Sequence, residues 1–217
     1  MPLSSEVLIA VAPLAMYLVL LGLLNLRKRP HVLTGSREIM LVGLALSGLV
    51  AIGPMQLFFP MNAANEFGTY VWVLLFIFYI LLLLLWVLIS RPRLIVYNVA
   101  SPQLRAVLSD VAMKLDSEAR WAGDCLALPQ LNVQLHLESF GFMRNVCLVS
   151  TGAEPSFTNW RRLEELLRGA LKQVEVSRSP RGYTFLVVGL LFATGLLFNV
   201  VKHPQTVAQG LIQIFRL

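Results

Sequence analysis

The sequence predicts an α-helical membrane protein with four transmembrane helices and an inserted small α+β domain of two layers. Four uncharged apolar runs are each about long enough to cross the hydrocarbon core of a bilayer: residues 7–26, 39–59, 70–89 and 183–201. Residues 91–181 separate the last two runs and hold most of the charged side chains. Because charged residues are costly inside a bilayer, we expect this segment to be a water-soluble domain that is anchored at both ends.

The chain is therefore divided into three predicted regions. Residues 1–90 form a three-helix transmembrane region, residues 91–181 a cytoplasmic α+β domain, and residues 182–217 the fourth transmembrane helix with a short amphipathic tail. Four apolar residues of the tail recur at helical spacing: Val207, Leu211, Ile214 and Phe215. This pattern is typical of a helix that lies on a membrane surface.

The basic residues predict the orientation in the membrane. Four of them stand in the short loop 27–38: Arg27, Lys28, Arg29 and Arg37. Loop 60–69 has one acidic residue and no basic one. Because Lys and Arg are retained on the cytoplasmic side, we expect a multi-pass protein of the cell (inner) membrane, with both termini outside and residues 91–181 inside.

The formal net charge of +6 does not predict nucleic-acid binding. Many basic residues gather at the edges of the apolar runs, where membrane topology alone requires them. The expected partners are the lipid bilayer and either other membrane-protein subunits or further copies of this chain.

Small residues recur on one face of the second apolar run. Gly43, Ser47 and Ala51 are spaced four apart, so they share one side of a helix and let a second helix approach closely in lipid. We expect this face to pack against another transmembrane helix of the same chain, and a dimer interface is the alternative.

The predicted soluble domain has the element order β-α-β-β-β-α. Strand patterns cover residues 94–99, 131–137 and 146–150, helical spacing covers 101–115 and 157–174, and a hairpin is expected around Gly123 and Asp124. Two amphipathic helices that cover one side of a small antiparallel sheet would form an α+β sandwich of two layers.

The clearest strand alternates between apolar and polar residues. Its apolar set is Leu131, Val133, Leu135 and Leu137, and its polar set is Asn132, Gln134, His136 and Glu138. Such alternation indicates one buried and one wet face. The polar set is the candidate partner-binding surface, and an ordinary solvated face is the alternative. The sequence leaves open whether Cys147 points to this side or to the core.

No constellation for catalysis is visible. The apolar runs lack charged residues, and the soluble segment lacks P-loop, GxGxxG, HExxH and GxSxG patterns. Cys125 and Cys147 have neither a CxxC spacing nor histidines in a metal-ligand pattern, so we expect small, partly buried strand residues. No catalytic residue, metal or cofactor is expected.

These observations favour a non-catalytic structural or accessory subunit of a membrane protein complex, which presents the α+β domain for docking. One alternative is a membrane-tethered ligand sensor or regulator. A second alternative is a transport accessory protein or a channel-forming oligomer.

Overall fold

The computed structural model describes residues 4–140, 144–152, 156–177 and 179–215 of the 217-residue chain, without the side chains of Phe140, Thr206, Leu211, Gln213 and Phe215. The chain forms two compact units. The helical unit consists of Met1–Leu21, Ile39–Ile89 and Thr184–Leu217, and the sheet unit consists of Gly22–Glu38 and Ser90–Tyr183.

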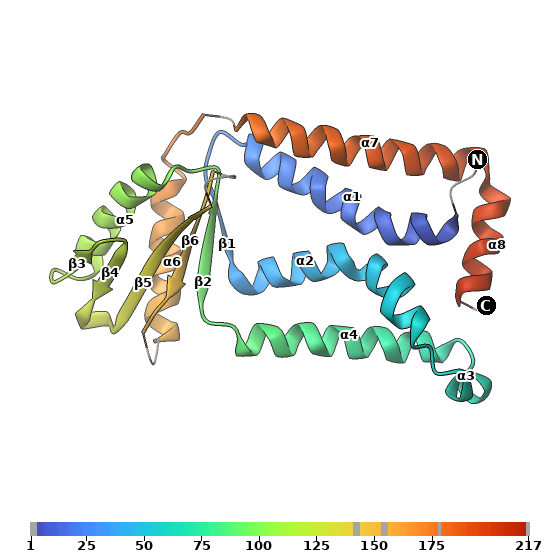
Figure 1. Ribbon diagram of the computed structural model, residues 1–217. Helices are drawn as coiled ribbons and strands as arrows, with labels where there is room; N and C mark the ends of the chain where they lie inside the picture. The colour runs from blue at the N-terminus through green and yellow to red at the C-terminus, as the bar shows by residue number, and fades with distance from the viewer. Residues whose placement is uncertain (1–3, 141–143, 153–155, 178, 216–217) are drawn as a thin grey trace. The chain divides into compact units, whose positions relative to one another are not determined.

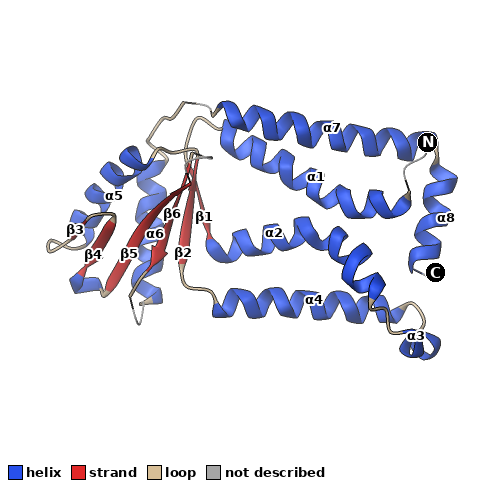
Figure 2. Cartoon of the chain, in the orientation of Figure 1, coloured by secondary structure: helices blue, strands red, loops and turns tan. Residues whose placement is uncertain are grey.

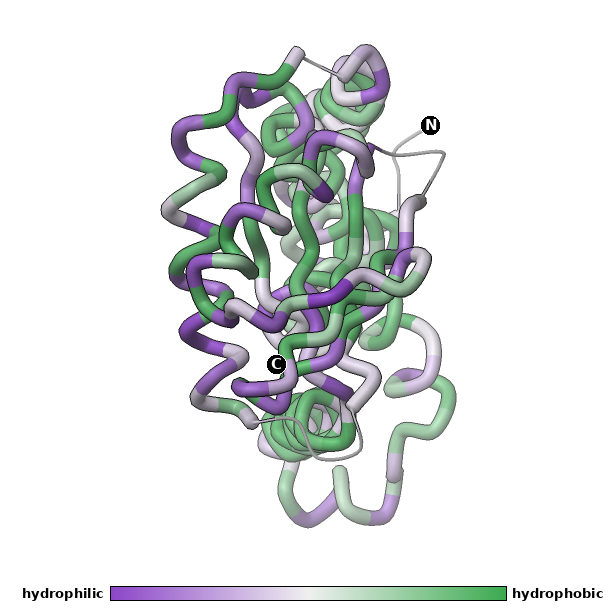
Figure 3. The backbone as a smooth tube through the Cα atoms, turned by 90° about the vertical axis from the view of Figure 1, so that its left-hand side faces the viewer, coloured by the Kyte–Doolittle hydropathy of each residue, from purple (hydrophilic) through white to green (hydrophobic). Residues whose placement is uncertain are grey.

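Four helices are long and apolar enough to cross a membrane, as predicted. They are α1 (Ser5–Leu26), α2 (Gly35–Val50) with a π-helix that continues it (Ala51–Met55), α4 (Tyr70–Ile89) and α7 (Pro180–Lys202). The mean hydropathy of their most apolar stretches runs from 1.8 to 3.0, and Figure 3 draws long stretches of helix in green. Helices suit such apolar runs because they satisfy every backbone hydrogen bond internally.

Two short helices complete the helical unit (Figure 1): α3 (Met61–Phe67), within the predicted loop 60–69, and α8 (Pro204–Phe215), within the predicted tail. The tail was expected to rest its apolar side on a membrane surface. Val207 is instead buried within the protein, and Ile214 packs against the cluster of Ala51, Met55 and Trp72. The side chains of Leu211 and Phe215, the other two residues of that prediction, lie outside the described part of the chain.

The sheet unit contains one antiparallel sheet of six strands, in the order β1-β2-β6-β5-β4-β3 (Figure 2). The strands are β1 (His31–Thr34), β2 (Arg93–Tyr97), β3 (Arg120–Ala122), β4 (Cys125–Leu128), β5 (Val133–Phe140) and β6 (Asn145–Ser150). The helices of this unit are α5 (Ser101–Leu115), α6 (Phe157–Leu171) and a single 3-10 turn (Pro129–Leu131).

The predicted order β-α-β-β-β-α omits two of these strands. The predicted order counts the hairpin as one β element. The hairpin is confirmed, and its two arms are the paired strands β3 and β4. The other omitted strand is β1, which lies in the basic loop that was predicted to have no regular structure, and which pairs with β2 at the edge of the sheet. Its four residues are too few for a periodic pattern, so its pairing with a distant segment decides its conformation.

Both long helices of the sheet unit share one hydrophobic core with the sheet. The strands contribute Leu94, Val96, Leu126, Leu135 and Leu148, and the helices contribute Leu104, Leu108, Leu163, Leu167 and Leu171, all nearly inaccessible to solvent. These strand residues lie on one face, because directly opposed residues of an antiparallel pair share a face and the register pairs Leu94 with Leu148. Burial of this leucine-rich face is the main force that holds the layers together.

Hydrogen bonds join the chain that leaves α1 to the chain that enters α7. The backbone N–H of Val176 donates to the carbonyl of Lys28 at 2.8 Å, and that of Ser179 donates to the carbonyl of Asn25 at 3.3 Å. The segments before β1 and after α6 are therefore part of the sheet unit.

Candidate functional site

The face of the sheet opposite α5 and α6 carries the predicted polar row. Gln134, His136 and Glu138 alternate along β5 with the buried Val133, Leu135 and Leu137. Gln134 and Glu138 are exposed and His136 is half-buried. We call Gln134, His136 and Glu138, together with the opposed Cys125 of β4, the polar sheet face.

The fourth residue of the predicted row, Asn132, does not belong to it. The residues before it form the 3-10 turn Pro129–Leu131, and Asn132 has a left-handed backbone, with φ of 51° and ψ of 43°. Asparagine tolerates this conformation better than most residues do. The alternation in the sequence therefore begins at Leu131, two residues before the strand itself, which begins at Val133.

Cys147 lies on the same side of the sheet as the polar row, because β6 places it directly opposite Glu138. Its side chain is nevertheless buried, as are those of Ile95 and Tyr97 on β2, which share this face. Burial raises the pKa of the Cys147 thiol to about 11, so it stays protonated at neutral pH. This side of the sheet thus changes from exposed and polar at β4 and β5 to buried and mainly apolar at β6 and β2.

Cys125 differs from Cys147 in both exposure and partner. It is exposed, and it stands directly opposite His136 in the pairing of β4 with β5. The Sγ of Cys125 is 3.3 Å from the Nδ1 of His136, within hydrogen-bond distance for sulfur. The expectation of a partly buried strand residue is therefore wrong for Cys125, which is exposed. Residues 125 and 136 become neighbours only through strand pairing, which sequence spacing does not show.

The turn beside Cys125 is held by a cation. Arg105 of α5 lies 4.4 Å from the ring centre of Trp121 and donates to the carbonyl of Gly123 at 2.7 Å. It also pairs with the carboxylate of Asp124 at 3.2 Å. Gly123 has φ of 61°, which a glycine adopts without strain.

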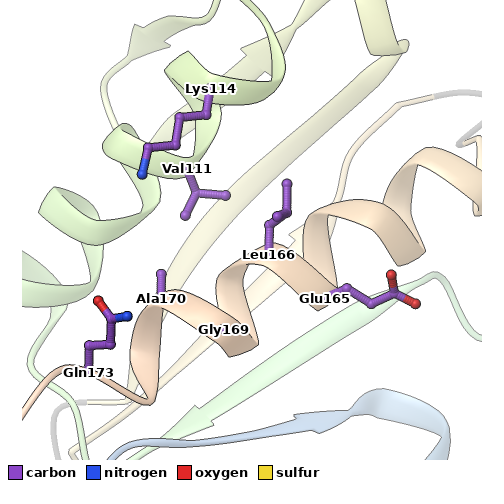
Figure 4. Close-up of a pocket in the computed structure, with 7 residues that line it drawn as sticks. All are labelled: Val111, Lys114, Glu165, Leu166, Gly169, Ala170 and Gln173. Atoms are coloured by element: carbon purple, nitrogen blue, oxygen red, sulfur yellow. The ribbon is translucent and has the colours of Figure 1, made fainter.

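A groove of about 310 Å³ lies between the two helices of the sheet unit (Figure 4). It is lined by Val111 and Lys114 from α5 and by Glu165, Leu166, Gly169, Ala170 and Gln173 from α6 and the residues that follow it. Val111 and Leu166 face each other across it. Leu166 is 43% exposed, whereas the neighbouring Leu163 and Leu167 of the same helix are buried.

The three small residues of α2 and its π-helical continuation have different surroundings. Gly43 lies against α4, where the hydroxyl of Tyr79 donates to its carbonyl at 2.7 Å. Ala51 is buried in the cluster with Met55 and Trp72, and Ser47 donates to the carbonyl of Leu44 in its own helix. Gly48, which the four-residue spacing skips, meets the backbone of α1 at Ile9.

Within the described residues, no group of three or more His, Cys, Asp or Glu side chains could hold a metal ion. The chain matches no protein-family model, no curated protein and no solved structure.

Proposed function

We propose that this chain is a non-catalytic structural or accessory subunit of a membrane protein complex, which binds a polar surface of another subunit through the polar sheet face. The observation that carries this proposal is the unequal covering of the sheet. One side is sealed by α5 and α6, whereas on the other side Gln134, Glu138 and Cys125 are exposed.

The side chains of this surface favour a hydrogen-bonding partner. Gln134 offers an amide, His136 an imidazole and Glu138 a carboxylate. The buried Leu135 and Leu137, which alternate with them, anchor the strand in the core. Groups on a strand that is fixed by its neighbours lose little conformational entropy when a partner binds.

The proposal includes the topology that the sequence predicts: a cell membrane location, with residues 91–181 in the cytoplasm and both termini outside. The pairing of β1 with β2 supports one part of it, because paired strands must lie on the same side of a bilayer. The basic loop 27–38 and the segment after α4 then share one compartment, as the positive-inside rule requires of both.

Topology is tested with reporters fused after residue 100 and after residue 217. We expect the first to report a cytoplasmic and the second an external location. An external location for the first reporter and a cytoplasmic one for the second would refute the orientation. This result would not bear on the docking proposal.

Docking is tested by mild detergent extraction of tagged full-length chain and mass spectrometry of the proteins that co-purify. We expect a stoichiometric membrane partner that is lost when Gln134, His136 and Glu138 are all changed to Ala. The matched control changes Arg161 and Arg162 to Ala, exposed residues of α6 on the other side of the sheet. A partner-free homo-oligomer, or equal loss in both variants, would contradict the proposal.

A ligand sensor is the second candidate, and the groove between α5 and α6 favours it. Its volume of about 310 Å³ is at the small end of the range for ligand pockets. A ligand-dependent rise in melting temperature that Leu166→Trp abolishes would support this function. Indifference of the melting temperature to a broad metabolite panel would count against it.

A further inference from the structure

The pair of Cys125 and His136 combines three features that a reactive thiol needs. The sulfur is exposed, an imidazole nitrogen lies 3.3 Å away, and the residues beside it on β3 and β4 are alanines. Ala122 stands opposite Cys125 on β3, and Ala127 follows it on the same face of β4. Neither alanine extends far enough to shield the sulfur from a molecule in solution.

We propose that Cys125 and His136 form a thiol-modification site that reacts with small disulfides such as oxidised glutathione. This site does not depend on the docking function proposed above. It depends on the contact between β4 and β5 alone.

The reaction is a thiol–disulfide exchange. With its own proton on Nε2, His136 accepts the thiol proton of Cys125 at Nδ1 as the sulfur attacks one sulfur of the reagent. A new S–S bond forms to Cys125 and the S–S bond of the reagent breaks. The second sulfur leaves as a thiolate, which takes up the proton from His136. Cys125 is oxidised to a mixed disulfide, and the released thiol is the reduced product.

The titratable groups around the pair come from β3, β5, β6 and α5 and from the turn before β4. Arg120 of β3 and Glu138 of β5 share this face, and Cys147 lies on it in β6. The carboxylate of Asp124, next to Cys125 in the chain, is paired with Arg105 of α5 at 3.2 Å. This ion pair offsets the negative charge that would otherwise oppose a developing thiolate.

Cys147 provides a comparison within the same molecule. It is buried, its pKa is raised to about 11, and it faces Glu138 instead of a histidine. It also cannot trap Cys125 in an internal disulfide. β5 lies between β4 and β6, so these two strands are about 10 Å apart. A disulfide needs Cα atoms within about 7 Å of each other.

The test uses the full-length chain in detergent at pH 7, with oxidised glutathione as the probe and intact-mass spectrometry as the readout. In a Cys147→Ala background we expect one glutathione adduct on Cys125, which a reductant removes. In the same background His136→Ala should slow its formation about tenfold or more. Added imidazole should restore part of the rate, an effect that a merely structural role of His136 would not give. Gln134→Ala on the same strand is the matched control and should react at the parent rate.

The same variants are also made with Cys147 retained, and protection of Cys147 in those chains reports whether each variant is folded. If Cys147 becomes reactive in His136→Ala, His136→Gln takes its place, because its amide keeps a polar side chain at the position without serving as a base. Three results would overturn the proposal: a full rate in a folded His136 variant, no rescue by imidazole, or, in the chain that keeps both cysteines, adduct formation on Cys147 as fast as on Cys125.

Discussion

The side-chain nitrogen Nδ2 of Asn98 donates a hydrogen bond of 2.7 Å to the carbonyl oxygen of Arg27. Asn98 is fully buried just after β2, and its backbone has a φ of 58°. Its own N–H donates to Oδ1 of Asn145, the first residue of β6, at 3.2 Å. One residue therefore joins the segment before β1 to the ends of two strands that lie far from it in the sequence.

We expect Asn98→Ala to destabilise the sheet unit by about 2–5 kcal/mol. It removes the buried side-chain hydrogen bond to the carbonyl of Arg27, which costs about 1–3 kcal/mol, and it puts alanine in a left-handed conformation, which costs about 1–2 kcal/mol. Asn98→Gly loses the same hydrogen bond but adopts the backbone without strain, so it should be the milder change. The stability of both variants is measured as the urea concentration at which Cys147 becomes reactive towards a thiol reagent. An Asn98→Gly chain as unstable as the alanine variant would show that backbone strain has no part.

The stability of the sheet unit should fall in mild acid because of His31. Burial, with smaller contributions from Arg27, Arg168 and Arg37, holds its pKa below the ordinary value of 6.5. From pH 6.5 down to the lowered pKa, the unfolded chain binds a proton at His31 that the folded chain resists. Stability is therefore lost as the pH falls through this window.

His31→Gln should reduce this acid dependence. The measurement is the urea midpoint at several values from pH 7.5 to pH 5, for the parent and the variant. His203→Gln, at an exposed position between α7 and α8, is the control and should follow the parent curve. Parallel curves for the parent and His31→Gln would mean that His31 does not contribute.

Cys147 should make the sheet unit less stable in alkali. Its pKa is raised from 9.0 to about 11 by burial, so the unfolded chain loses the thiol proton first as the pH rises between these values. Stability contributed by the protonated thiol is complete below pH 9 and is lost on the way to pH 11. Cys147→Ala should shrink the drop in melting temperature between pH 8.5 and pH 10, whereas Cys125→Ala should leave it unchanged. An equal drop in both variants would assign it to other groups.

In the helical unit, Gly48→Leu should push α1 and α2 apart. A Cβ at Gly48 would collide with the carbonyl oxygen of Ile9, which cannot move without shifting the backbone of α1. Overpacking of this kind costs about 1–3 kcal/mol. Gly53→Leu is the matched control, because no atom lies within 4 Å of a Cβ built there. Melting temperatures in the same detergent compare the two, and equal losses would argue against close packing at Gly48.

Sequence patterns predicted the elements whose side chains repeat over many residues. The four apolar helices follow from uncharged runs of 19 to 21 residues, and the exposed and buried sides of β5 follow from strict alternation at Val133 to Glu138. The predicted hairpin at Gly123 is also present, because a tight turn is a local property. Elements of this kind can be predicted because neighbouring residues in the chain decide their conformation.

Other features depend on residues that are distant in the chain. β1 exists because His31–Thr34 pairs with β2, and the face that Cys147 occupies depends on the register of β6 against β5. The contact between Cys125 and His136 and the groove between α5 and α6 have the same origin.

The sequence by itself determined where the apolar helices lie and which side of the longest strand is wet, because those properties are encoded in local periodicity and hydrophobicity. The tertiary structure alone decided which side chains meet. A one-residue shift in strand register would move Cys147 from the side of the polar row to the core, and no local pattern sets that register. The candidate modification site therefore follows from the pairing of β4 with β5. The position at which α5 and α6 pack decides which side of the sheet is covered.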